Sequence, residues 1–137
     1  MFDLDDFKSV NDTFGHQTGD EYLKHVGEVL KETIGDDGLA ARVGGDEFFA
    51  YVHCKNEAEL KQLILRLMKR FEKSPYWAEN IPLEIRFSLG ASCYPHHGDK
   101  LETLIHKADQ AMYKIKRNGK NDFYIWNEEL ETSGSSR

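Results

Sequence analysis

Hydrophobic residues recur at the spacing of an amphipathic helix in three stretches of the chain. Each stretch is preceded by a potential N-cap residue, with a glutamate three positions later, and is followed by a helix-terminating sequence. These features predict helices from Thr18 to Gly35, from Asn56 to Ser74 and from Asp99 to Asn118. The apolar stripe of each helix is best explained as part of a hydrophobic core.

The segments between these helices show the shorter period of β-strands. Apolar and polar residues alternate from Leu83 to Cys93, which predicts a strand with one apolar face. Two β-prone runs within 40–52 are joined by Gly44-Gly45-Asp46-Glu47, which predicts a β-hairpin with acidic residues at its tip. The remaining predicted segments are the end of a buried strand at Met1–Leu4, a short helical or irregular segment at Ser9–Phe14 and a final strand at Asp122–Trp126.

Length, charge and cysteine content restrict the class of protein. The 137 residues suffice for a single domain with one sizeable core. The formal net charge of −6 argues against a general nucleic-acid or membrane-surface binder, and no apolar run approaches the length of a membrane span. Cys54 and Cys93 lack the spacing of a zinc site, so we expect reduced thiols in a cytoplasmic protein.

The predicted hairpin tip carries two adjacent carboxylates, Asp46 and Glu47. They repel each other unless a cation lies beside them, and a divalent metal ion that carries a phosphate would serve. Glycine at 44 and 45 can take the positive φ that a tight turn needs, and it lets a ligand approach the backbone closely. An isolated match to these four residues is better explained as a solvated turn, so the interpretation depends on the rest of the chain.

Further blocks of sequence accompany this turn. The blocks are Phe2–Asp12, Gly15–Asp20, Arg42–Phe48 and Ala108–Asn121. In their order and spacing they closely resemble the GGDEF family of diguanylate cyclases, over residues 1–126. The resemblance implies an α+β fold that is nucleotidyl-cyclase-like and palm-like, with a mixed, largely antiparallel central sheet wrapped by helices. It assigns residues 1–127 to the GGDEF domain and leaves 128–137 as a flexible C-terminal tail.

The resemblance implies that two GTP molecules are condensed into cyclic di-GMP with release of pyrophosphate. Phosphoryl transfer relies on positioning and on neutralising charge, for which carboxylate-bound Mg²⁺, or Mn²⁺, is suited. The implied metal ligands are Asp3, the backbone carbonyl of Leu4, Asp46 and Glu47. Asp46 and Glu47 would share metal binding with activation of the attacking ribose 3′-hydroxyl, and either one could be the catalytic base.

Other positions that the resemblance identifies concern the nucleotide. Asn11 and Asp20 match positions that recognise guanine, and Gly19 is expected to leave room for the base. The implied phosphate contacts are the backbone N–H groups of the Asp5–Lys8 turn, which includes Phe7 and Lys8, and the side chains of Lys116 and Lys120. From the residues alone, Asp20 would interact with a helix dipole, and both lysines would be ordinary cations at a helix C-terminus.

Each domain resembles a half-site for one GTP, so catalysis is expected in a homodimer. Gly35 and Gly38 stand where many family members have the Arg and Asp of an inhibitory site, so feedback by cyclic di-GMP is not expected. The helix that usually opens the family domain does not precede Met1, which is expected to uncover an apolar sheet face. A sensory domain upstream of this chain is a further expectation.

The sequence is also compatible with two other functions. An impaired GGDEF domain would bind GTP or cyclic di-GMP without turnover and would act as a regulatory module. A purely structural dimerisation domain is a third interpretation, although such a domain has no physical need to gather acidic residues on a turn.

Overall fold

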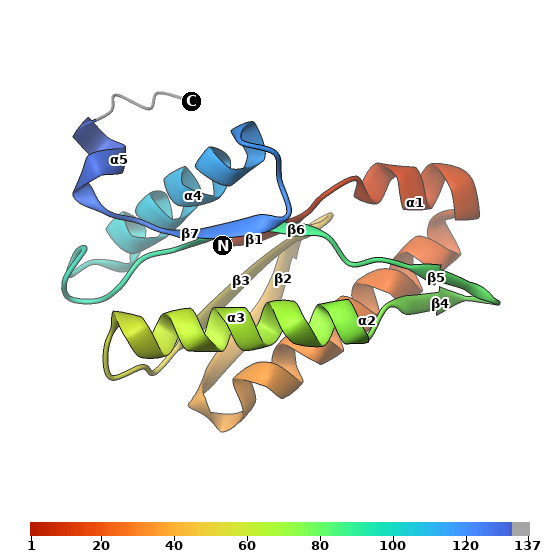
Figure 1. The fold of residues 1–137 in the computed structure, drawn as a ribbon, viewed down its shortest axis with the longest axis horizontal. Coiled ribbons are helices and arrows are strands. Elements are labelled where there is room, and N and C mark those ends of the chain that lie inside the picture. Colours follow the sequence, from red (N-terminus) through yellow and green to blue (C-terminus); the bar gives the residue numbers. More distant parts are fainter. Residues whose placement is uncertain (133–137) are drawn as a thin grey trace. The chain divides into compact units, whose positions relative to one another are not determined.

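The computed structural model describes residues 1–132 (Figure 1). Within the described residues the chain divides into two compact units: residues 4–86, and residues 1–3 together with residues 87–132. No helix within the described part of the chain is both long enough and apolar enough to cross a membrane.

The unit of residues 4–86 contains helices and two antiparallel hairpins. Its elements are α1 (Phe7–Phe14), α2 (His16–Ile34), the 3₁₀ turn η1 (Gly35–Asp37), β2 (Gly38–Gly44), β3 (Glu47–Val52), α3 (Glu57–Lys73), β4 (Tyr76–Ala78) and β5 (Ile81–Leu83). β2 pairs with β3, as predicted, and β4 pairs with β5. The β4–β5 hairpin was not predicted, because strands of three residues are too short to show an alternation.

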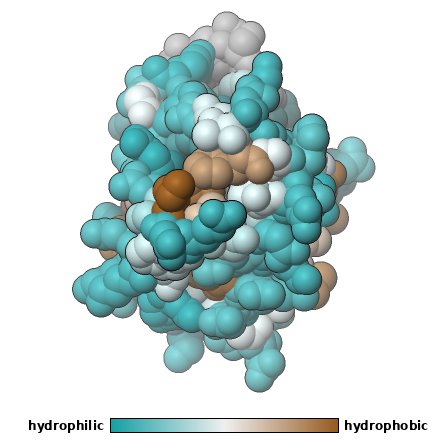
Figure 2. Space-filling view, turned by 90° about the vertical axis from the view of Figure 1, so that its right-hand side faces the viewer, coloured by the Kyte–Doolittle hydropathy of each residue, from teal (hydrophilic) through white to brown (hydrophobic). Residues whose placement is uncertain are grey.

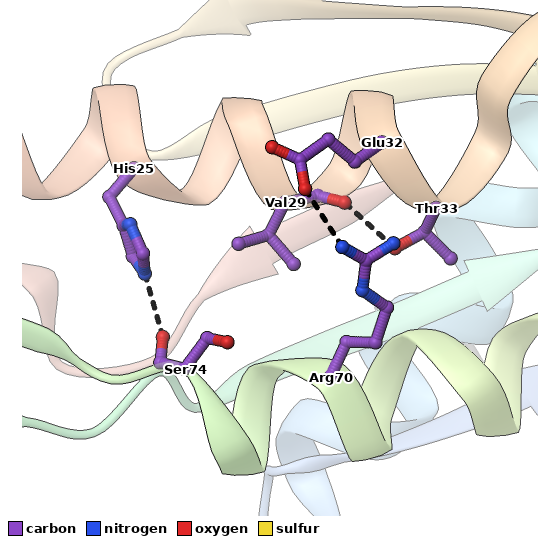
Figure 3. A network of polar contacts seen from close by, with 6 residues as sticks. All are labelled: His25, Val29, Glu32, Thr33, Arg70 and Ser74. Atoms are coloured by element: carbon purple, nitrogen blue, oxygen red, sulfur yellow. Dashed lines mark hydrogen bonds and ion pairs between the residues drawn. The ribbon is translucent and has the colours of Figure 1, made fainter.

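Helices α2 and α3 lie side by side in this unit (Figure 1). Polar contacts tie them together (Figure 3): His25 Nε2 lies 2.7 Å from the carbonyl oxygen of Ser74, and Arg70 Nη2 lies 2.8 Å from Glu32 Oε2. The ion pair is exposed, so it contributes little to stability. Apolar residues of both helices are buried, among them Val26 on α2 and Leu67 on α3, and such burial stabilises a fold more than an exposed ion pair does.

The other unit is built around a strand that is buried on both faces. Its elements are β1 (Phe2–Leu4, with Leu4 in the first unit), β6 (Phe87–Ala91), α4 (Leu101–Arg117), β7 (Asp122–Ile125) and α5 (Glu128–Thr132). β6 and β7 are parallel, and the N–H of Gly90 donates to the carbonyl of Met1 at 2.8 Å. The rings of Phe2 and Phe87 stack with centroids 4.9 Å apart.

The prediction of a single strand from Leu83 to Cys93 with one polar face was wrong, both in the length of the strand and in the exposure of that face. β5 ends at Leu83 and β6 begins at Phe87, so the residues between them are not strand. Ser88 and Gly90, which the alternation placed on a polar face, are buried. A Cβ on Gly90 would overlap the backbone of α4, so this face of β6 is covered by a closely packed helix and not by water.

The helix starts show where local capping rules hold. α3 begins as predicted, because Asn56 Oδ1 accepts a hydrogen bond from the N–H of Glu59 at 2.9 Å. α2 begins earlier than predicted, directly after Gly15, so Thr18 lies inside the helix and forms no N-cap. α4 also differs, since Lys100 and not Asp99 precedes its first residue.

The C-terminal segment is folded beyond the predicted domain end. Residues 128–132, predicted as the start of a flexible tail, form α5. Leu130 is 2% exposed and belongs to a small core with Ala111 and Trp126. The rest of the predicted tail, residues 133–137, lies outside the described residues.

Candidate active site

The acidic turn joins β2 to β3. Gly44 pairs with Glu47 in the antiparallel register, which leaves Gly45 and Asp46 as the two turn residues. Asp46 and Glu47 are half-buried. The N–H of Leu4 donates to the carbonyl of Asp46 at 3.0 Å, so a backbone hydrogen bond places the end of β1 beside the turn.

The two glycines of the turn are not explained by backbone conformation. Neither Gly44 nor Gly45 has a positive φ, so that part of the prediction was wrong. A Cβ added to either residue would meet no atom within 4 Å. Packing within the described chain therefore does not require glycine either, and the effect of the two glycines is to keep the backbone of the turn accessible to a ligand.

Asp3 is a buried carboxylate that is paired with a lysine of its own unit. Its exposed fraction is 8%, and Lys116 Nζ donates a hydrogen bond to its Oδ2. Burying a carboxylate is costly unless a cation or hydrogen-bond donors compensate its charge, and Lys116 supplies that positive charge. Two residues predicted to bind the metal ion and a phosphate are thus bound to each other in this structure.

The predicted metal ligands fit a divalent cation by chemistry. Carboxylate and carbonyl oxygens are the donors that Mg²⁺ and Mn²⁺ prefer. Within residues 1–132, however, no group of three or more His, Cys, Asp or Glu side chains is arranged to hold a metal ion. Leu4 lies beside the turn, while Asp3 is engaged by Lys116, so metal binding stays a prediction.

Helices α1 and α2 bring Asn11 next to the segment that carries Asp20. A Cβ on Gly19 would overlap Oδ1 of Asn11 and would lie 3.0 Å from its Cγ and 3.4 Å from Cζ of Phe7. The space above Gly19 that was predicted to receive the base is therefore occupied by the amide of Asn11. Asp20 is the next residue of α2 and is exposed.

Tyr22 is a residue of this region that the sequence indicated only as part of the core. It is 1% exposed, its ring centroid lies 6.0 Å from that of Phe7, and its hydroxyl donates to the carbonyl of Glu84 at 2.9 Å. Burial and, to a lesser extent, the charge of Asp5 raise the pKa of Tyr22 above its ordinary value. A tyrosine in an apolar stripe gives no sequence signal for these contacts.

The turn before α1 offers fewer backbone donors than predicted. The N–H of Asp5 already donates to the carbonyl of Arg86 at 2.8 Å. Asp6 has a left-handed conformation, with φ of 59°, and the helix begins at Phe7. N–H groups in the first turn of a helix have no acceptor within the helix and attract anions, so phosphate binding by the N–H groups of Phe7 and Lys8 stays a prediction, whereas the N–H of Asp5 already has an acceptor.

The two lysines predicted to bind phosphate, Lys116 and Lys120, lie close together in sequence at the C-terminal end of α4. Lys116 is in the last turn of the helix, and Lys120 lies in the loop after it. The N–H of Lys120 donates to the carbonyl of Ile115 at 3.0 Å across Gly119, whose φ is 111°, as in a Schellman motif. The predicted helix end at Asn118 is confirmed, and this cap fixes the backbone at the exposed Lys120.

The adjacent residues His96 and His97, in the loop between β6 and α4, differ in their exposure: His97 is buried, although two neighbouring histidines in a loop are expected to be solvated. That residue is 6% exposed, and its Nδ1 accepts a hydrogen bond from the N–H of Cys93 at 2.9 Å. Its ring contacts Trp126 edge to face, with centroids 5.2 Å apart. His97 therefore serves to hold its loop, while His96 is exposed.

The fold and the acidic turn together define a nucleotidyl-cyclase-like domain. The chain belongs to the GGDEF domain family, because the family model described as "Diguanylate cyclase, GGDEF domain" matches residues 1–122.

Individual relatives agree with this assignment. The chain is 36% identical over 131 residues to diguanylate cyclase DosC of Escherichia coli (strain K12), a match that covers 95% of this chain and 28% of DosC. The chain thus spans less than a third of that relative.

Solved structures show the same fold. The GGDEF domain of TpbB (YfiN) from Pseudomonas aeruginosa matches with a TM-score of 0.90 and 26% identity, over 98% of this chain and 79% of that chain. The active GGEEF domain of a diguanylate cyclase from Vibrio cholerae matches with a TM-score of 0.79 and 32% identity, over 92% and 80%. These likenesses confirm the predicted mixed, largely antiparallel fold class.

Proposed function

We propose that this domain is a diguanylate cyclase, which condenses two GTP molecules into cyclic di-GMP and releases pyrophosphate. The observation that carries the proposal is the acidic turn, in which Asp46 and Glu47 follow two glycines that neither conformation nor packing of the described chain requires. Family membership and the names of DosC and of the Vibrio cholerae domain support it. Both cysteines are thiols, which suits the cytoplasmic location that we propose.

In each half-reaction, the ribose 3′-oxygen of one GTP forms a bond to the α-phosphorus of the other, and the bond from that phosphorus to pyrophosphate breaks. Asp46 or Glu47 accepts the proton of the attacking hydroxyl. Bound Mg²⁺ or Mn²⁺ would neutralise charge on the phosphate oxygens, and Asp3, the carbonyl of Leu4, Asp46 and Glu47 would hold it.

The remaining predicted residues bind and orient the nucleotide. Lys116 and Lys120 contact the terminal phosphates, together with the backbone N–H groups of Phe7 and Lys8. Asn11 and Asp20 recognise guanine. Because Lys116 is paired with Asp3 in this structure, its contact with phosphate requires an exchange of partners. Each domain holds one GTP, so the reaction takes place between two domains of a homodimer.

The test is incubation of the purified chain with GTP and Mg²⁺, followed by chromatography of the products. We expect cyclic di-GMP from the wild type and at least about a hundredfold less from Asp46→Asn, since loss of a general base typically costs this much or more. Asp36→Asn is the matched control, because Asp36 is an exposed acid outside the turn and its loss should leave the rate unchanged. A folded wild-type protein that gives no cyclic product above the Asp46→Asn level contradicts the proposal.

A second candidate function is a binding module without turnover. The pairing of Asp3 with Lys116 favours it, because a carboxylate held by an ammonium group is not available to a metal ion. Calorimetry that detects GTP binding, combined with no release of pyrophosphate, would select this function over the cyclase.

A further inference from the structure

The contact between Gly19 and Asn11 explains a glycine that helix stability does not. Gly19 is a buried residue within α2. Glycine inside a helix is less favourable than alanine, so its presence weakens α2 unless a neighbour requires it. That neighbour is the side chain of Asn11, whose Oδ1 lies where the Cβ of any other residue at position 19 would be.

The backbone and the side chain of Asn11 have different contacts. No residue of α1 is buried. Figure 2 shows the side of the molecule that carries α1 in Figure 1, where a small hydrophobic area is surrounded by hydrophilic residues. The carbonyl of Asn11 accepts a hydrogen bond from the N–H of Gly15 at 2.8 Å, which fixes its backbone but not its amide. Packing on Gly19 is a contact of the Asn11 amide itself.

We infer that Gly19 is a positioning residue for guanine recognition: it lets Oδ1 of Asn11 pack against α2 and so leaves Nδ2 to donate to the base. This inference rests on the proposed use of GTP. An amide nitrogen donates, whereas the carboxylate of Asp20 accepts. Guanine combines an acceptor at O6 with a donor at N2, while adenine has a donor at N6, so a donor beside an acceptor favours guanine.

The experiment compares two glycine-to-alanine substitutions in the same helix. Gly19→Ala displaces the Asn11 amide, while Gly27→Ala is the matched control, because its Cβ would lie 3.8 Å from Phe48 Cε2, an ordinary contact. Both changes improve helix propensity. The overlap at Gly19 is with the flexible end of a side chain that can rotate away, so both variants should fold.

Dissociation constants for GTP and ATP are measured by calorimetry, with Asp46→Asn also present in every protein to prevent turnover. Gly19→Ala should weaken GTP binding roughly tenfold, as expected for one lost hydrogen bond to a charged or polar group, and should change ATP binding little. Gly27→Ala should change neither. When Asn11→Ala is also present, Gly19→Ala should have no further effect, because the residue through which it acts is gone.

Three results overturn the inference. The first is that Gly19→Ala binds GTP as tightly as Gly27→Ala. The second is that Gly19→Ala weakens GTP binding just as much when Asn11→Ala is present. The third is that Gly19→Ala unfolds, which would assign Gly19 to general packing.

A second measurement does not depend on GTP. The side-chain NH₂ signals of Asn11 in nuclear magnetic resonance spectra should shift in nucleotide-free Gly19→Ala and not in Gly27→Ala, and unshifted signals also overturn the inference. If these signals shift while the wild type binds no GTP, the proposed function fails and the role in guanine recognition fails with it, although Asn11 still packs on Gly19.

Discussion

At the scale of single residues, glycines in this chain serve different purposes that their neighbours determine. At Gly90 an added Cβ would overlap the backbone of α4, which cannot move without separating helix and strand. At Gly19 it would overlap only the end of a side chain, which can rotate. At Gly44 it would meet nothing. Gly90 is therefore required by the fold, and Gly19 positions another residue. Gly44 has no such role in packing, so we assign it to keeping the turn accessible to a ligand.

Tyr22 allows a prediction about pH. Its pKa is raised mainly by burial, so the fold holds the neutral phenol. The stabilisation is fully present below the pKa of tyrosine in the unfolded chain, about 10, and is lost as the pH rises from there toward the raised value in the folded state. Tyr22→Phe removes the hydroxyl and its hydrogen bond to Glu84.

We expect Tyr22→Phe to lower the free energy of unfolding by about 1 kcal/mol at neutral pH, the usual net value of one hydrogen bond. Above about pH 10 the difference should shrink, and near pH 11 the order should reverse, because the unfolded wild type gains stability by ionising and the variant does not. Urea unfolding of both proteins at a series of pH values measures the difference. A difference that stays constant across this range would show that the buried phenol does not contribute to alkaline unfolding.

At the scale of elements, the start of α3 is held by a side chain that can be tested directly. Asn56 Oδ1 accepts from the N–H of Glu59, and Glu59 Oε1 accepts from the N–H of Lys55 at 3.3 Å. Asn56→Ala should lower the free energy of unfolding by about 1 kcal/mol, as is typical for loss of an N-cap. Asn56→Asp keeps the acceptor and should be close to wild type. Equal destabilisation by both substitutions in urea unfolding would show that the cap is not the cause.

A helix or strand could be predicted from the sequence where the residues that define it lie close together along the chain. α3 could be predicted because its cap and apolar stripe lie in one continuous segment. The start of α2 could not be predicted in this way. The N–H of Gly15 donates to the carbonyl of Asn11 at the end of α1, and α2 begins at the next residue. The double burial of β6 depends on α4, which lies later in the chain, so the alternation of Ser88 and Gly90 was misleading.

At the scale of the whole molecule, the sequence predicts the hairpin that carries the acidic residues better than it predicts the contacts of the candidate site residues. The hairpin and its acids could be predicted from adjacent residues, and the structure confirms the turn. The pairing of Asp3 with Lys116 joins residues that are 113 positions apart, and no local pattern indicates it. The same holds for the contact of Asn11 with Gly19, since the amide orientation depends on how two helices pack.

The proposed reaction also makes a prediction about assembly. If each domain holds one GTP, two domains must meet for the 3′-oxygen of one nucleotide to reach the α-phosphorus of the other. A net charge of −6 on each chain opposes this association. We therefore expect the rate per chain to rise with protein concentration at saturating GTP, and this can be measured by the release of pyrophosphate.

Mixing distinguishes a tight dimer from a chain that acts alone. An excess of Asp46→Asn protein added to a fixed amount of wild type should lower the rate, because most wild-type chains are then in mixed dimers with one intact acidic turn. Addition of Asp36→Asn protein should instead raise it, since those chains keep the turn. A rate per chain that is independent of concentration and unaffected by the Asp46→Asn protein would mean that one domain completes the reaction alone, which a half-site with a single GTP cannot do.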